Sequence, residues 1–100
     1  MYRHGDVMLA AADAVPDSAT PRPGTTLARG EATGHSHRFA VDRPGDVELF
    51  DHDGVGYARV NCDSARLVHD EHATIQVPRG IFRFWMQREY SPAEIRRIVD

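Results

Sequence analysis

The chain has 100 residues, and we expect residues 1–100 to fold as one domain with a single core. Its net charge of −3 at pH 7 argues against binding of long nucleic acid, which usually needs a basic face. No apolar run reaches the roughly 20 residues that a membrane helix needs, and no secretory signal is expected. The chain has one cysteine, which excludes an internal disulfide and a thiolate metal cage. We therefore expect a cytoplasmic protein with no membrane partner.

Short strands separated by turn residues are expected along the first 60 residues. Residues 6–10 form the opening strand, and residues 14–26, with three prolines and one glycine, predict a loop. Residues 25–33 and 35–41 are expected to pair as a hairpin through Gly34. The clearest hairpin spans residues 47–60, where two alternating runs flank an Asp-Gly turn.

The last third of the chain predicts two more strands and then a helix. The strands cover residues 65–77 and 81–90, with a turn at the Pro-Arg-Gly sequence between them. Residues 91–100 begin with Ser-Pro-Ala-Glu, a capping box with proline at the first helical position. The fold class predicted is mainly β, a small barrel or rolled antiparallel sheet with one short C-terminal α-helix.

Four of the six histidines fall in two short motifs, GHSHR at residues 34–38 and HDEH at residues 69–72. Because side chains alternate along a strand, His35 and His37 should share the inward side of Phe39. The first motif therefore predicts two inward imidazoles at one end of an apolar run.

The second motif extends this prediction to a pocket. In the expected strand 65–77, His69 and Glu71 share the odd numbering of Leu67 and should point inward, whereas His72 should point away unless the strand bulges. Buried polar groups need partners, so these side chains would serve one another or a ligand.

The first two interpretations of the pocket are a structural role and a metal site. In the first, the histidines only satisfy backbone carbonyls, and His4 and His52 are given no functional role. In the second, the imidazoles and a carboxylate bind zinc, iron, manganese or nickel. The His-Ser-His pair resembles the first motif of cupins, which are small β-barrels. However, the glutamate of that motif is absent, and Arg83 stands where the second cupin motif has a histidine.

The third interpretation is metal-free phosphodiester cleavage, in which two histidines act as general base and general acid. Arginines would hold the phosphate and stabilise the charge of the transition state. The expected catalytic residues are His35, His37, His69 and Glu71. The expected substrate-binding residues are Arg38, His72, Arg88 and Tyr90. Whether the same pocket holds a metal stays open.

The motifs GHSHR, HDEH and QREYSPAEIRRI together resemble, over most of the chain, a family of short bacterial and phage proteins associated with the ring nucleases of type III CRISPR immunity. The resemblance implies a homodimer that degrades cyclic oligoadenylate, a small anionic nucleotide, without a cofactor. The predicted function is therefore a histidine-centred phosphodiesterase in antiviral defence. The alternatives are a cupin-like metalloprotein with one divalent metal ion and a non-enzymatic module that binds a small ligand.

Overall fold

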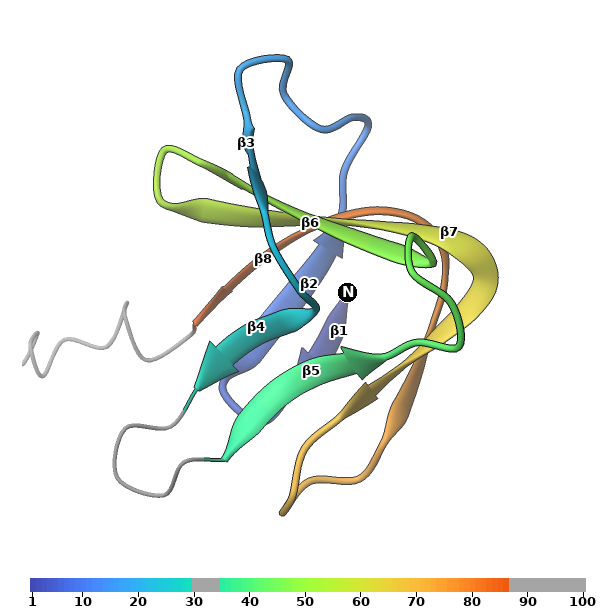
Figure 1. Ribbon diagram of the computed structural model, residues 1–100. Helices are drawn as coiled ribbons and strands as arrows, with labels where there is room; N and C mark the ends of the chain where they lie inside the picture. Colours follow the sequence, from blue (N-terminus) through green and yellow to red (C-terminus); the bar gives the residue numbers. More distant parts are fainter. Residues whose placement is uncertain (30–34, 87–100) are drawn as a thin grey trace, which may run out of the picture.

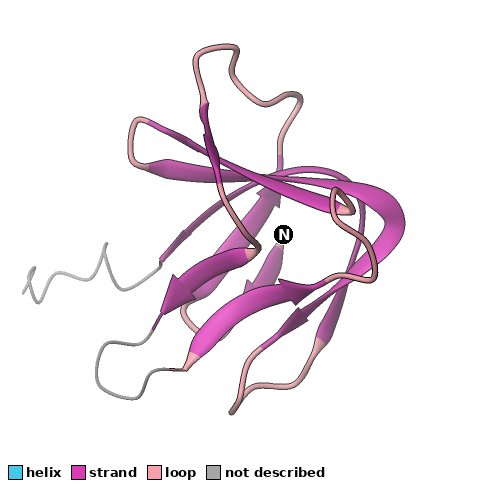
Figure 2. Cartoon of the chain, viewed as in Figure 1, coloured by secondary structure: helices cyan, strands magenta, loops and turns pink. Residues whose placement is uncertain are grey.

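The computed structural model describes residues 1–29 and 35–86, and this part of the chain consists of strands and loops without a helix (Figures 1 and 2). The strands are β1 (Tyr2–His4), β2 (Val7–Ala11), β3 (Thr20–Arg22), β4 (Thr26–Arg29), β5 (Ser36–Ala40), β6 (Val47–His52), β7 (Val55–Val68) and β8 (Ile75–Met86). The predicted mainly β fold is confirmed. The helix predicted at residues 91–100 lies outside the described residues.

The strands form one antiparallel sheet in the order β1-β2-β8-β7-β5-β4, and β6 pairs with β7 and carries β3. The two long strands β7 and β8 curve, so that the sheet rolls and β4 and β5 come to lie across from β1 and β2 (Figure 1). A hydrogen bond between side chains of β1 and β5 joins these two parts of the sheet. Strands that are distant in the sheet order therefore meet at one end of the roll.

A bulge in β7 produces the change of direction. Val60 pairs with Gly80 and Ser64 with Pro78, so residues 61–63 of β7 stand opposite one residue of β8. Bulges bend a strand and increase its twist. Here the first half of β7 pairs with β6 and its second half with β5. The predicted turn at residues 78–80 is wrong, because these residues lie inside β8, where the bulge tolerates a proline without an N–H.

The connection between β7 and β8 also differs from the prediction. Residues 69–74 form the loop between them, so the HDEH motif lies in a loop and not in a continuous strand over residues 65–77. Apolar side chains on both sides of this loop still face the core, since Leu67 and Val77 are fully buried. The loop therefore places the motif at one end of the rolled sheet (Figure 1).

The proline-rich segment expected as a loop over residues 14–26 contains a short strand. β3 pairs with β6 at the edge of the sheet, where Pro21 is tolerated because an edge strand needs fewer N–H donors. The Arg22 guanidinium holds the segment in place, with Nε 3.1 Å from one carboxylate oxygen of Asp51 and Nη2 2.5 Å from the other. The sequence pattern did not predict this bidentate pair.

Two predicted hairpins are present. β6 and β7 are joined by Asp53 and Gly54, whose φ angles of 51° and 81° suit a tight turn with positive φ at both central positions. β4 and β5 pair antiparallel, although the turn predicted at Gly34 lies outside the described residues.

The core is formed by alternating apolar side chains of the sheet: Val7, Leu9, Leu27, Phe39, Val47, Leu49, Ala58, Val60, Ala65, Leu67, Val77, Phe82 and Phe84. In the part of the chain that is described, no helix has the length and apolarity to cross a membrane.

Candidate functional site: a histidine cluster

Four imidazole rings meet where the two ends of the sheet approach each other. His4 ends β1, His37 lies in β5, and His69 and His72 come from the loop between β7 and β8. Their ring centroids are separated by 4.3 Å for His37 and His69, the shortest distance, and by 6.3 Å for His4 and His69, the longest. We call these four residues the histidine cluster.

The turn between β1 and β2 leaves room for the cluster because its first residue is glycine. Gly5 has φ +62°, and a Cβ atom at this position would lie 2.6 Å from Nε2 of His72 and 3.1 Å from Cε1 of His37. Both the backbone conformation and the close approach therefore favour glycine here. The expected opening strand at residues 6–10 is thus the second strand of a hairpin that packs against the site.

Burial keeps the inner rings of the cluster neutral. Burial and then the nearby rings of His69, His4 and His72 lower the pKa of His37 from 6.5 to about 4, whereas Asp6 acts in the opposite direction. Burial also lowers the pKa of His4, against the effect of its hydrogen bond to the Ala73 carbonyl. At pH 7 both rings are therefore uncharged, and each has one N–H and one lone pair.

The hydrogen bonds then fix which nitrogen of each inner ring carries the proton. A carbonyl only accepts, so His4 Nε2 donates to the Ala73 oxygen, which lies 3.0 Å away. His4 Nδ1 consequently has the lone pair and accepts from His37 Nδ1 at 2.9 Å. His37 Nε2 is left with a lone pair, which suits a metal ligand or a general base.

Three of the four rings have the donor set of a metal site. One ring nitrogen of each of His37, His69 and His72 lies within 4.8 Å of the other two. Zinc–nitrogen bonds of ~2.1 Å place tetrahedral ligands ~3.4 Å apart, so the rings would close in by roughly an ångström on binding. His72 is exposed and can make this movement more easily than the buried His37.

His69 has a second hydrogen bond that matters for both metal binding and proton transfer. Its Nδ1 accepts the backbone N–H of Glu71 at 3.0 Å. A neutral His69 therefore carries its proton on Nε2. Coordination of a metal through either nitrogen gives up this hydrogen bond, because Nδ1 would then either bind the ion or carry the proton. The same arrangement leaves an N–H donor on His69, whose ring centroid lies 4.3 Å from that of His37.

Acidic side chains surround the outer edge of the cluster. Asp70 and Glu71 each lie 3.6 Å from the ring of His35, and that ring packs at 5.6 Å from the ring of His69. Arg38 is exposed on the outward side of β5, between the buried His37 and Phe39, with Asp70 as its ion-pair partner at 3.9 Å. The described surroundings of the cluster thus favour a cation over an anion.

Of the eight predicted site residues, the structure brings the rings of His35, His37, His69 and His72 together. The expectation that His72 points away is wrong, because alternation does not apply to a loop. Glu71 lies at the exposed outer edge, Arg38 lies on the outward face, and Arg88 and Tyr90 are outside the described residues. His4 was given no function from the sequence, yet it belongs to the cluster. Its contact with His37 arises only when the sheet rolls, so no sequence pattern indicates it.

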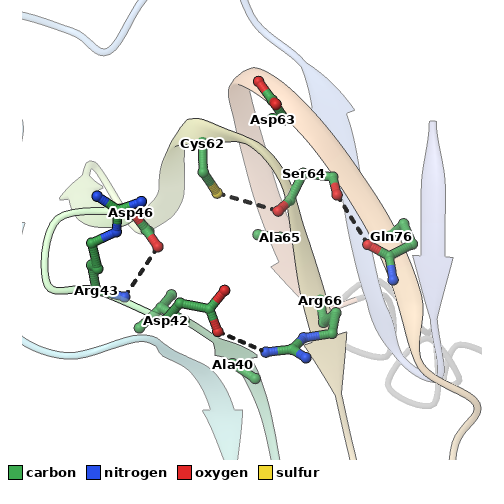
Figure 3. Close-up of a pocket in the computed structure, with 11 residues that line it drawn as sticks. Ala40, Asp42, Arg43, Asp46, Cys62, Asp63, Ser64, Ala65, Arg66 and Gln76 are labelled. Carbon is green, nitrogen blue, oxygen red and sulfur yellow. Dashed lines mark hydrogen bonds and ion pairs between the residues drawn. The ribbon is translucent and has the colours of Figure 1, made fainter.

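A second concave region lies beside the bulge of β7 and has a volume of about 380 Å³ (Figure 3). Its polar side chains bond one another. The Cys62 thiol donates to the Ser64 carbonyl, the Ser64 hydroxyl donates to Gln76, and Arg66 pairs with Asp42 at 3.5 Å. This cleft mixes aspartates with arginines, and among the described residues the only converging group of three metal-ligating side chains is in the histidine cluster, which is therefore the stronger candidate site.

The fold and the site together define a small rolled antiparallel sheet with clustered histidines at one end. The family described as "Domain of unknown function (DUF8820)" matches residues 3–87, and the chain belongs to this family. The matched range includes the whole histidine cluster. No curated protein and no solved structure matches the chain. The family description gives no activity, so the function has to be argued from the site.

Proposed function

We propose that the protein binds one divalent transition-metal ion, with zinc as the first candidate, through His37, His69 and His72. The observation that carries the proposal is the convergence of three ring nitrogens within 4.8 Å, supplied by β5 and the loop between β7 and β8. Neutral imidazole is a common ligand of zinc, copper, iron and nickel. Of the alternatives that the sequence left open, the metalloprotein is the one that this geometry favours most.

The charges around the cluster support the same choice. Burial and the neighbouring rings disfavour a proton on His37 and on His4, and these effects keep His37 neutral and able to bind a metal at pH 7. Asp6 interacts electrostatically with His37, and Asp70 and Glu71 lie at the outer edge. These carboxylates attract a metal cation, although Asp70 is also the ion-pair partner of Arg38, and a bound ion would in turn attract the phosphate group of a substrate.

The proposed site has three protein ligands, which is the number found in catalytic zinc sites that keep a fourth position for water or substrate. Exposure of His72 gives this position access to solvent. A bound ion would act as a Lewis acid and lower the pKa of a water molecule towards ~7, which suits hydrolysis. The substrate class that we propose, a small phosphodiester such as cyclic oligoadenylate, rests on the resemblance of the sequence motifs.

One observation favours a second candidate, metal-free acid–base cleavage. The hydrogen bond from the Glu71 amide leaves a proton on Nε2 of His69. The centroid of this ring lies 4.3 Å from that of His37, whose Nε2 has a lone pair. A donor beside a base is the pair that general acid–base catalysis of phosphodiester cleavage uses. This candidate still needs a cation to hold the phosphate, and Arg38 is turned to the outward face.

Zinc binding by calorimetry and by metal analysis after dialysis tests the proposal. We expect one equivalent per chain, lost in His72→Ala and retained in His52→Ala. The latter is a matched control, because His52 lies in β6 and contacts Ser18 and Asp53, away from the cluster. Equal binding by both variants, or no stoichiometric binding of zinc, iron, manganese, cobalt, nickel or copper by the wild type, would overturn it.

Cleavage of cyclic oligoadenylate then separates the two candidates. The metal site predicts activity that is lost in EDTA and restored by one divalent metal. Activity that survives EDTA and ends in 2′,3′-cyclic phosphate products selects the acid–base reaction, because a general base would activate the neighbouring 2′-hydroxyl. A protein that binds the nucleotide and releases it intact is a ligand-binding module.

A further inference from the structure

His4 lies in the cluster but outside the group of three ring nitrogens proposed to hold the ion. Its side chain is buried, with the residue only 2% exposed, and both ring nitrogens are used. Nε2 bonds the Ala73 carbonyl in the loop that carries His69 and His72, and Nδ1 bonds His37. His4 therefore links the loop to β5 through a single ring.

The direction of these hydrogen bonds has a consequence for His37. The ring of His37 can exist in two neutral tautomers, and only one of them donates from Nδ1 to the lone pair of His4. That tautomer has its remaining lone pair on Nε2. Without His4, none of the hydrogen bonds described for the His37 ring would select one of its two tautomers.

On the basis of the proposed metal site, we infer that His4 is a positioning residue. Its hydrogen bond holds His37 in the tautomer and orientation that present Nε2 to the ion. Metal-binding histidines commonly donate their other N–H to a neighbouring group, and removal of that group typically lowers metal affinity about 10–100-fold. Here the acceptor is a second histidine, which the Ala73 carbonyl orients in turn.

A purely structural role for His4 is the competing explanation, because its bond to His37 also joins β1 to β5. The two explanations predict different effects of substitution. A structural link affects the stability of the fold, whereas a positioning residue also changes the proton position on His37 and the affinity for metal.

The test compares His4→Gln with His4→Leu. A glutamine amide carries one group that can accept from His37 and one that can donate to the Ala73 carbonyl, and leucine has neither. We expect His4→Leu to bind zinc about 10–100-fold more weakly than the wild type and His4→Gln to recover most of that loss. Circular dichroism establishes that each variant retains its β structure, and His52→Ala again provides the control.

Long-range ¹H–¹⁵N NMR of the metal-free wild type reads the tautomer of His37 directly and does not depend on the folding of any variant. We expect the proton on Nδ1. A proton on Nε2, or equal zinc affinity in the wild type and both folded variants, would overturn the role of His4 while leaving the metal site intact. Absence of stoichiometric binding of zinc and of the other five metals by the wild type would instead overturn the proposed function, and the positioning of a metal ligand with it.

Discussion

Acidification should destabilise the metal-free protein in a pH range set by His37. The pKa of this residue is 6.5 when the chain is unfolded and about 4 in the folded protein, where burial and three neighbouring rings oppose its protonation. Between these values the unfolded state takes up a proton that the folded state does not. The free energy of unfolding therefore falls as the pH drops below about 6.5 and stops falling from this cause near pH 4.

The size of the effect follows from the two pKa values. Each pH unit across the interval from 6.5 to about 4 is worth about 1.4 kcal/mol, which gives a loss of about 3 kcal/mol for His37. The lowered pKa of His4 adds to the loss in the same direction. Since small domains are stable by only about 5–15 kcal/mol, the change should be easy to measure.

Urea unfolding in EDTA, followed by the fluorescence of Trp85, measures the change from about pH 7.5 to about pH 4.5. His37→Gln removes the titrating ring and should show a clearly smaller loss over this range. Glu48 contributes separately at lower pH, because hydrogen bonds from Asn61 and Arg59 lower its pKa below 4.5. A wild-type stability that is constant from about pH 7 to about pH 5, or that falls as steeply in His37→Gln, would show that His37 does not control stability in this range.

Three further changes test the fold that supports the site, each by equilibrium urea unfolding. Leu67→Ala removes a fully buried side chain and should cost about 2–5 kcal/mol, and a loss below about 1 kcal/mol would contradict its place in the core. Gly54→Ala should cost about 1–2 kcal/mol because the turn requires φ 81° there, and an unchanged stability would mean that the turn has another conformation. Arg22→Leu should cost about 1–3 kcal/mol by removing the bidentate pair with Asp51 and the hydrogen bonds to two backbone carbonyls, and an unchanged stability would contradict this role. Asp51→Asn should cost less, because it leaves the bonds to the carbonyls in place.

The sequence predicted the parts of the fold that depend on local patterns. Alternation placed Phe39, Leu67 and Phe84 on the inward side, and the Asp53-Gly54 pair marked a hairpin. These signals need only neighbouring residues, because side chains alternate along any strand and few residues accept positive φ.

The limits of β7 and β8 were mispredicted for physical reasons. The loop between them, residues 69–74, has an even number of residues. Leu67 before the loop and Val77 after it are therefore both odd-numbered and both buried, so the alternation of buried residues does not reveal that a loop interrupts the predicted strand. Proline and glycine usually indicate a turn, but Pro78 and Gly80 lie in β8 beside the bulge. Sequence alone does not distinguish a turn from a bulge that bends a continuous strand.

The candidate site was predictable only in part. Its outer rings come from the two histidine motifs, which are visible in the sequence. The contact between His4 and His37 joins β1 to β5, two strands that are not neighbours in the sheet, and it follows from the rolling of the whole sheet. No spacing in the chain pairs these two residues, so the hydrogen bonds that order the cluster required the three-dimensional structure.

Titration with Co²⁺, followed by the visible absorption of the bound ion, is the most direct test of the proposed metal site. The proposed metal site predicts saturation at one equivalent per chain in the wild type and in His52→Ala, loss of the bound-ion spectrum in His72→Ala, and displacement of Co²⁺ by Zn²⁺. A wild type that shows no saturable spectrum, or a His72→Ala variant whose spectrum matches the wild type, would contradict it.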